Sequence, residues 1–293
     1  MRDRLRAAGW GYAFISPALI LTAVFLVFPI GFMLFISLHK WGLLGAPKFI
    51  GFDNFAFLAG DGRFWRSIVN TILYGVLAVP SQIALGLFLA ILVNRKVRGQ
   101  QGFRTIFFIP LAISFVAAGI LFTWMFATTP IEGFFPKLFS SLGLEFPRWQ
   151  TTDGFGAMVM ITLMNTWKST GYCMIVYLAG LQGINKEWLE AASIDGVRTQ
   201  WQEFRHLTWP LLAPTTFLLV VTTTIFTVRG FEPIFVMTQG GPAGGTTTLV
   251  YYLYSKFPDA VGIASAAGTV LLVGVLGLTL VQFLAQSRRS TYY

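Results

Sequence analysis

Three charged side chains lie inside long apolar stretches of the sequence: Lys168, Arg229 and Glu232. Charged residues in such stretches are costly in a membrane and usually face a cavity or a partner. Glu232 follows Arg229 by three residues, so the two would share a helix face and could form an ion pair. The pattern fits either a salt bridge that locks helices together, or a polar lining that hydrogen-bonds hydroxyl groups or a phosphate.

Hydrogen-bonding side chains and aromatic rings accompany these charges in the fourth and fifth apolar segments. A pyranose ring has apolar CH faces bordered by hydroxyl groups, so sugar sites combine aromatic rings with hydrogen-bonding groups. The sequence therefore predicts a solute path lined by such residues. The candidates are Asn165, Trp167, Lys168, Tyr172, Thr223, Phe226, Arg229 and Glu232. Their intervals do not place all of them on one face of each helix, so some must be packing residues.

The sequence contains no pattern for catalysis or metal binding. Its one cysteine, Cys173, excludes an internal disulfide, and its two histidines, His39 and His206, lie far apart without neighbouring cysteine or paired carboxylates. The glycine-rich run 240–245 lacks the Lys-Ser/Thr ending of a phosphate-binding loop, and we expect a tight turn there. We predict no catalytic residue, no metal site and no cofactor bound by this chain.

Composition indicates a membrane protein. The chain is 55% hydrophobic and 11% charged, with a mean hydropathy of +0.67, far more apolar than an average soluble domain. The formal net charge is +9, but the basic residues form short clusters beside apolar runs and no patch interleaved with aromatic residues. The charge therefore indicates membrane topology and argues against a nucleic-acid partner.

Six apolar segments are long enough to cross a bilayer as helices, which takes roughly 20 residues each. They lie at about 12–37, 68–94, 105–128, 155–183, 211–238 and 260–286. The first follows a basic stub like that of a signal peptide, but it is longer, contains Pro17 and Pro29 and lacks a clear cleavage site. We therefore predict an all-α membrane protein with six transmembrane helices in a single domain, 1–293.

Lysine and arginine residues fall mainly on one side of these spans. Twelve lie in the termini and two loops on that side, seven lie in three loops on the other side, and four of the twelve occupy the short loop 94–104. Such residues concentrate on the cytoplasmic side of a membrane. Both termini are therefore predicted to be cytoplasmic, and the loops 38–67, 129–154 and 239–259 to face outward.

The predicted cytoplasmic segment 184–210, between the fourth and fifth spans, has the signals of two short helices in a helix-turn-helix. Asn185 suits an N-cap and Glu187 the first turn, while Gly196 supplies a break at which the chain turns. Pro210 suits the first turn of the next span. Apolar residues stand beside charged ones, as in helices that lie on a membrane or dock into a protein groove.

Within this segment, Glu190-Ala191-Ala192, three further residues, Gly196 and a Leu-Thr-Trp-Pro run at 207–210 resemble the cytoplasmic coupling motif of ATP-binding-cassette (ABC) importer permeases. Other motifs extend the resemblance to nearly the whole chain. They are FISPA at 14–18, GFDNF at 51–55, FRTIFFIP at 103–110, TWKSTG at 166–171 and TQGGP at 238–242. Together they are similar to the carbohydrate-uptake branch, in particular to its first permease subunit in the maltose and glycerol-3-phosphate types.

The resemblance implies a docking site and a set of partners. In this family the motif inserts into a cleft on an ATPase subunit, so Glu190 and Gly196 are expected at that contact, with Ala191, Ala192 and Asp195 shaping the docking helix. A second homologous permease would complete the solute path in the inner membrane of a prokaryotic cell. Two partner ATPases would bind ATP and magnesium, and an extracytoplasmic solute-binding protein would deliver a small-molecule solute.

Two features depart from the usual pattern of this family. The stretch after Gly196 is one residue longer, and Trp209 stands where a leucine is common. Both departures fall in the second helix of the coupling segment, so the resemblance places the first helix more firmly than the second.

Other interpretations of the same residues stay open. An ion-coupled secondary transporter predicts acidic or histidine relays and internal repeats, for which Glu232 alone offers little support. A membrane-embedded enzyme would need a metal cluster or a nucleophile with a base. The segment around Glu190 also fits an interfacial loop with a capping carboxylate. The loop 94–104 either sets topology or adds an ATPase contact, and the run 240–245 fits a plain hairpin or a loop near the solute-binding protein.

Overall fold

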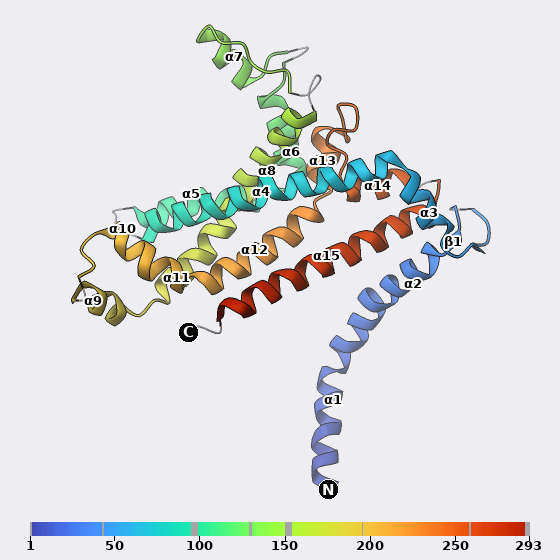
Figure 1. The fold of residues 1–293 in the computed structure, drawn as a ribbon, viewed down its shortest axis with the longest axis horizontal. Helices are drawn as coiled ribbons and strands as arrows, with labels where there is room; N and C mark the ends of the chain where they lie inside the picture. The colour runs from blue at the N-terminus through green and yellow to red at the C-terminus, as the bar shows by residue number, and fades with distance from the viewer. Residues whose placement is uncertain are drawn as a thin grey trace. The chain divides into compact units, whose positions relative to one another are not determined.

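The computed structural model describes residues 2–42, 44–94, 99–128, 131–149, 154–194, 196–257 and 259–290, which are mostly helical (Figure 1). The first elements are α1 (Arg2–Thr22), the π turn η1 (Ala23–Val27), α2 (Phe28–Ser37), β1 (His39–Lys40), β2 (Lys48–Phe49), α3 (Asp53–Gly60), α4 (Gly62–Asn94), α5 (Gln100–Ala112), α6 (Phe115–Met125) and α7 (Phe134–Ser141). The later elements are α8 (Gly154–Gln182), α9 (Lys186–Ile194), α10 (Gln200–Glu203), the π turn η2 (Phe204–Thr208), α11 (Trp209–Leu211), α12 (Ala213–Val228), α13 (Glu232–Met237), α14 (Leu249–Lys256) and α15 (Val261–Ser290). The two strands pair antiparallel.

Three helical stretches among the described residues are long and apolar enough to cross a membrane: Tyr12–Ser37, Gly62–Asn94 and Val261–Gln286. They coincide with the first, second and last of the predicted spans. Two strongly bent helix pairs raise the number to five if each pair is one span. The predicted fourth span coincides in position with α8. The chain is therefore a mostly helical membrane protein with several spans.

The prediction of one helix over 105–128 is wrong, because the chain forms α5 and α6 there with a bend of 98° between them. Ser114 starts the second helix as its N-cap, and its hydroxyl accepts a hydrogen bond of 3.1 Å from the Ala117 backbone N–H. The carbonyls left at the end of α5 find a donor elsewhere, in Lys168 of α8. Both helix ends are thus satisfied, which allows the sharp bend.

The prediction of one helix over 211–238 is also wrong. A bend of 63° separates the helical stretch 200–211 from α12, and the chain breaks again between α12 and α13. Gly230 disfavours a helix, and Pro233 has no N–H to donate to the Arg229 carbonyl in a continued helix. The sequence stays apolar across these residues, but the backbone hydrogen bonds of the helix are interrupted there.

Each π turn stands directly before a proline. Phe28, before Pro29, and Trp209, before Pro210, donate their backbone N–H groups five residues back instead of four. A proline ring clashes with the carbonyl four residues before it in an α-helix, and the wider π turn gives that carbonyl room. The helix therefore continues through both prolines.

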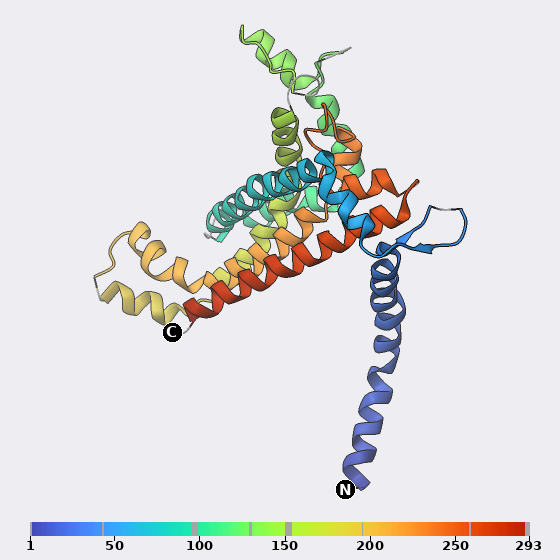
Figure 2. The same cartoon turned by 45° about the vertical axis from the view of Figure 1, so that its right-hand side comes forward.

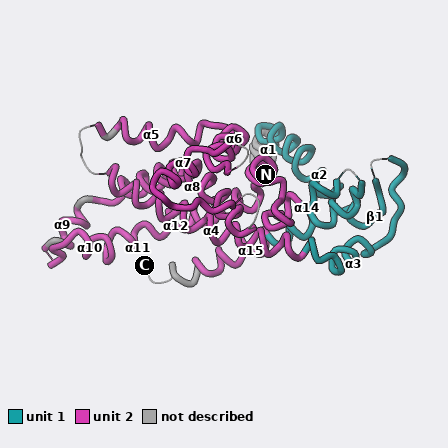
Figure 3. The backbone as a smooth tube through the Cα atoms, turned by 90° about the horizontal axis from the view of Figure 1, so that it is seen from above, with its two compact units in different colours: residues 1–64, 252–274 teal, residues 65–251, 275–293 magenta. Residues whose placement is uncertain are grey.

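The chain divides into two compact units, residues 1–64 with 252–274 and residues 65–251 with 275–293 (Figure 3). In the second unit, α8 runs alongside α5 and α12 (Figures 1 and 2). Most side chains of the middle of α8 are buried. At Gly171 the helix approaches α5 so closely that an added Cβ would lie 2.3 Å from the Phe107 carbonyl oxygen. Helix α8 is therefore the scaffold of this unit.

The run 240–245 forms the predicted tight turn, and α4 of the same unit fixes it. The Asn70 side-chain amide donates to the Gly244 carbonyl at 2.9 Å, and the Arg66 guanidinium donates to the Ala243 carbonyl at 3.1 Å. Gly244 has a φ of +76°, a conformation that residues with a Cβ rarely adopt. The turn is thus held by side chains from a distant part of the sequence.

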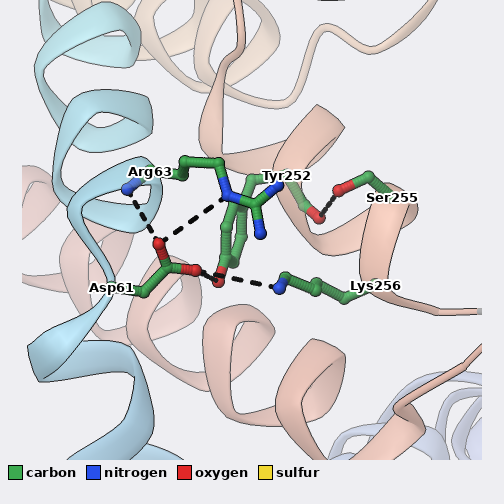
Figure 4. Close-up of polar contacts among 5 residues, drawn as sticks. All are labelled: Asp61, Arg63, Tyr252, Ser255 and Lys256. Carbon is green, nitrogen blue, oxygen red and sulfur yellow. Dashed lines mark hydrogen bonds and ion pairs between the residues drawn. The ribbon is translucent and has the colours of Figure 1, made fainter. Parts of the chain in front are cut away.

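In the first unit, Asp61 joins the start of α4 to α14 (Figure 4). Its carboxylate accepts hydrogen bonds from the Tyr252 hydroxyl at 2.7 Å and from the Arg63 backbone N–H at 2.8 Å. The ammonium of Lys256 lies 3.8 Å away. Burial opposes ionisation of this carboxyl, but the two hydrogen bonds and the nearby cations outweigh it, so the pKa of Asp61 lies below its ordinary value.

This lowered pKa makes the contact sensitive to acid. The folded protein favours the Asp61 carboxylate more than the unfolded chain does, so the stabilisation is present above the ordinary pKa of 3.8 and is lost as the pH falls through the lower folded value. We expect thermal stability in detergent to fall more steeply below about pH 4 in the wild type than in Asp61→Asn. Tyr252→Phe, which removes one donor, should reduce the difference. Parallel curves for wild type and Asp61→Asn would contradict the assignment.

Candidate functional site

A cavity of about 450 Å³ lies within the second unit, among α4, α5, α6, α8, α12 and α13. Its wall combines hydrogen-bonding groups with aromatic rings and includes residues beside the break between α5 and α6 and the break between α12 and α13. The lining residues are Tyr74, Gln82, Leu111, Phe115, Asn165, Ser169, Tyr172, Thr223, Phe226, Thr227, Arg229, Gly230, Glu232 and Pro233. The volume lies in the usual range of small-molecule sites, roughly 300–1,000 Å³.

Six of the eight residues predicted for the solute path line this cavity: Asn165, Tyr172, Thr223, Phe226, Arg229 and Glu232. On α8, Asn165, Ser169 and Tyr172 recur at intervals of four and three residues, so they share one face of the helix. Asn165 and Thr223 are buried, whereas Arg229 and Glu232 are exposed. The cavity wall therefore has an uncharged buried part and a charged exposed part.

Arg229 and Glu232 do not share a helix face, as the sequence spacing suggested. Helix α12 ends just before Arg229, and Glu232 begins α13. No ion pair within 4.0 Å joins the two residues, both of which the structure describes. The salt bridge considered from the sequence is therefore not formed, and both charges border the cavity separately.

Trp167 and Lys168 are not in the cavity wall. Trp167 lies on another side of α8, where its ring packs against Phe122 with 5.3 Å between the ring centroids. Its position two residues after Asn165 turns it away from the lining face. Neither residue lines this cavity, so the cavity gives no support to the prediction that they line the path.

Lys168 binds the end of α5 instead. Its ammonium donates hydrogen bonds to the carbonyl oxygens of Leu111 at 3.0 Å, Pro110 at 3.4 Å and Ile113. It also lies 4.6 Å from the centre of the Phe115 ring. A cation at a helix C-terminus satisfies orphan carbonyls and complements the helix dipole. Lys168 thus stabilises the bend that brings Leu111 and Phe115 to the cavity.

Sequence reasoning missed several lining residues. Tyr74 and Gln82 come from α4, which carries no charged residue in its middle to draw attention. Ser169 could have been found, because it stands one helical turn after Asn165. Leu111 and Phe115 depend on the bend between α5 and α6, which hydropathy does not reveal.

The first helix of the coupling segment has the predicted caps. The Asn185 side chain accepts a hydrogen bond of 3.1 Å from the Glu187 backbone N–H. At the other end, Gly196 has a φ of +96°, and the Val197 N–H bonds the Ala192 carbonyl at 3.0 Å, as in a Schellman cap. These caps define the helix that carries Glu190 and Ala191, both exposed. Asp195 lies outside the described residues.

The second helix of the segment extends further than predicted. Thr199 and Gln202 form a capping box at its start. The aromatic rings of Trp201, Phe204 and Trp209 follow one another at centroid distances of 5.8 and 6.1 Å. Pro210 lies within this stretch and before the 63° bend, so it does not start the next span as the sequence suggested.

No group of three or more His, Cys, Asp or Glu side chains that could hold a metal ion occurs among the residues the structure describes. The polar groups of the cavity wall are hydroxyls, amides and two separate charges of opposite sign. Such a wall can bind a polar solute through hydrogen bonds.

Comparison with known proteins identifies the kind of transport system. Residues 82–290 match the family described as binding-protein-dependent transport system inner membrane component. The chain belongs to this family. It is a permease component of an ABC importer, as the sequence motifs indicated.

Relatives of this permease match along nearly its whole length. The lactose transport system permease protein LacF of Rhizobium radiobacter is 37% identical over 286 residues, which cover 95% of this chain and 94% of that protein. The sn-glycerol-3-phosphate transport system permease protein UgpA of Agrobacterium fabrum is 35% identical and covers 96% of each chain. A chain of a bacterial alginate ABC transporter, crystallised with an alginate pentasaccharide-bound periplasmic protein, superposes with a TM-score of 0.84 at 26% identity, over 99% of this permease and 98% of that chain.

The role of Lys168 can be tested by Lys168→Met, which keeps the length of the side chain and removes its ammonium. We expect a loss of about 2–3 kcal/mol of stability, because three carbonyls would lose a charged donor. Thermal unfolding of the purified complex in detergent would measure it. Lys137→Met, at an exposed position of α7, is the matched control and should unfold like the wild type. Equal stability of both variants would show that the ammonium does not hold the bend.

Proposed function

We propose that this permease forms, with a second homologous permease, the membrane path for a sugar, an oligosaccharide or a glycerol-3-phosphate-like solute. The cavity is the observation that carries the proposal, because it combines buried hydrogen-bonding groups with aromatic rings in a chain of an importer family. The named solutes of the relatives, lactose, sn-glycerol-3-phosphate and alginate, support this class of solute.

In the proposed topology, the chain is one transmembrane domain with six spans in a prokaryotic inner membrane. Helix α8 is the fourth span, and the bent stretches around α5 with α6 and around α12 are the third and fifth. A span surrounded by protein needs less apolar surface than one that faces lipid, which suits the buried helix α8. The excess of lysine and arginine supports cytoplasmic termini and a cytoplasmic coupling segment.

The coupling segment is proposed to dock on a partner ATPase through α9. Glu190, Ala191, Ala192 and Gly196 would lie at the contact, with Asp195 beside them. The capped helix ends support this role, because a helix that transmits force must keep its shape. Two such ATPases would bind ATP and magnesium, so this chain would not be an enzyme. A solute-binding protein on the outer side would deliver the solute, and no nucleic acid takes part.

The decisive test of the function is uptake into proteoliposomes that contain both permeases, the ATPases and the solute-binding protein. We expect uptake of sugar or sn-glycerol-3-phosphate only when ATP is present on the side of the membrane that carries the ATPases. An ATPase with its catalytic carboxylate removed should abolish uptake. Uptake that survives this change and follows a proton or sodium gradient would support an ion-coupled transporter and overturn the proposal.

The docking proposal predicts that Glu190→Lys releases the ATPase from the membrane without unfolding the permease, because it reverses a charge on the exposed surface of α9. Co-purification of the ATPase with tagged permease would measure the contact, and thermal unfolding would confirm that the variant is folded. Glu145→Lys, the same exchange at an exposed site in a predicted outward loop, should bind the ATPase normally. Normal binding and transport by the Glu190 variant would show that α9 docks elsewhere.

A further inference from the structure

Two polar side chains of α4, Tyr74 and Gln82, lie in the cavity wall and are almost completely buried. Their exposed fractions are 1% and 2%. They stand eight residues apart, about two turns along one side of the helix. Neither residue has been given a role by the sequence motifs, and both line the cavity together with the buried Asn165 and Thr223.

One buried polar atom of each of these two side chains lacks a hydrogen-bond partner. Neither the Tyr74 hydroxyl nor the Gln82 amide nitrogen forms a hydrogen bond with any residue that the structure describes. The Asn165 side chain lies close enough to the Tyr74 hydroxyl to interact with it, but their contact does not have the geometry of a hydrogen bond. Buried polar groups are nearly always paired, and unpaired ones that border a cavity are suited to pair with a ligand.

We infer that Tyr74 and Gln82 form a subsite for neighbouring hydroxyl groups of an uncharged sugar ring. This inference rests on the proposed function and narrows its solute class. An amide offers a donor and an acceptor side by side, and a phenol can both donate and accept. Two neighbouring sugar hydroxyls offer the same combination, so each side chain finds a partner whichever way the amide is turned.

An anionic group would fit this part of the cavity poorly. Phosphate and carboxylate oxygens mainly accept hydrogen bonds and need a cation nearby. The cation of the cavity wall, Arg229, is exposed, while the buried Lys168 is engaged with the carbonyls at the end of α5. Asn165, Ser169 and Thr223, which line the same cavity, are uncharged hydrogen-bonding residues. The buried part of the cavity thus recognises hydroxyls, and any charge on a solute would lie toward Arg229.

The test compares Gln82→Met and Tyr74→Phe in the complete importer, reconstituted in proteoliposomes. The probes are lactose, maltose, sn-glycerol-3-phosphate and, for whichever sugar is transported, its single-deoxy analogues. We expect each substitution to raise KM for the sugar about tenfold, the usual size for one lost hydrogen bond to a buried group. Each should also remove the preference for the sugar over one deoxy analogue, which a purely structural defect would not do.

Two matched controls separate recognition from packing. Tyr177→Phe removes a buried hydroxyl of α8 that bonds Thr216 and is not in the cavity wall. Gln282→Met changes a glutamine of α15 that is also outside that wall. Both should keep the wild-type preference among deoxy analogues. If Gln82→Met does not assemble, Gln82→Glu keeps the shape and replaces the donor with a charge, and it should show the same loss of preference.

Unchanged KM and unchanged preference in the Gln82 and Tyr74 variants would overturn the subsite. A wild-type importer that transports sn-glycerol-3-phosphate but neither neutral sugar would overturn it too, while leaving the proposed function intact. Failure of the wild-type importer to transport any probe with ATP would instead count against the proposed function, and the subsite that rests on it would fall with it.

Discussion

At the end of α5 and just after it, three carbonyl oxygens accept hydrogen bonds from the ammonium of Lys168. In the interior of a membrane protein water is scarce, and a carbonyl without a donor is costly. The bend of 98° between α5 and α6 therefore calls for a donor from a neighbouring helix. Lys168 supplies it, and the bend places Leu111 and Phe115 in the cavity wall. The buried ammonium of Lys168 thus shapes the cavity by binding backbone carbonyls, and it does not face the cavity itself.

The second break completes the arrangement on the other side of the cavity. Helix α12 carries Thr223 and Thr227 into the buried part of the wall, and it stops before Arg229. The turn that follows leaves Arg229 and Glu232 at the exposed part, where their charges cost least. Helix α8 stands between the two broken stretches and contributes one face to the cavity and another to Lys168 and Trp167. Packing against α8 thus holds both broken stretches, α5 with α6 and α12 with α13, in place.

The positions of several helices could be predicted from the sequence, because apolar runs indicate where helices lie and capping residues indicate where they begin and end. Asn185 and Gly196 bound α9 as expected, and α8 lies where its apolar run predicted. The breaks were missed because Pro233 and Gly230 hardly change a hydropathy average while they interrupt the hydrogen-bond ladder. The misplacement of Lys168 has a different cause. Sequence spacing shows that a lysine in a span needs a partner, but only tertiary contacts show that its partner is backbone.

The segment 184–210 connects to the cavity through a single continuous stretch of chain. The helical stretch 200–211 leads over the 63° bend directly into α12, which lines the cavity. That stretch contains the π turn η2, which takes about one more residue per turn than an α-helix. A movement of the helical stretch 200–211 would therefore reach Thr223 and Phe226 through α12, with the bend at Leu212 as the point where its direction can change.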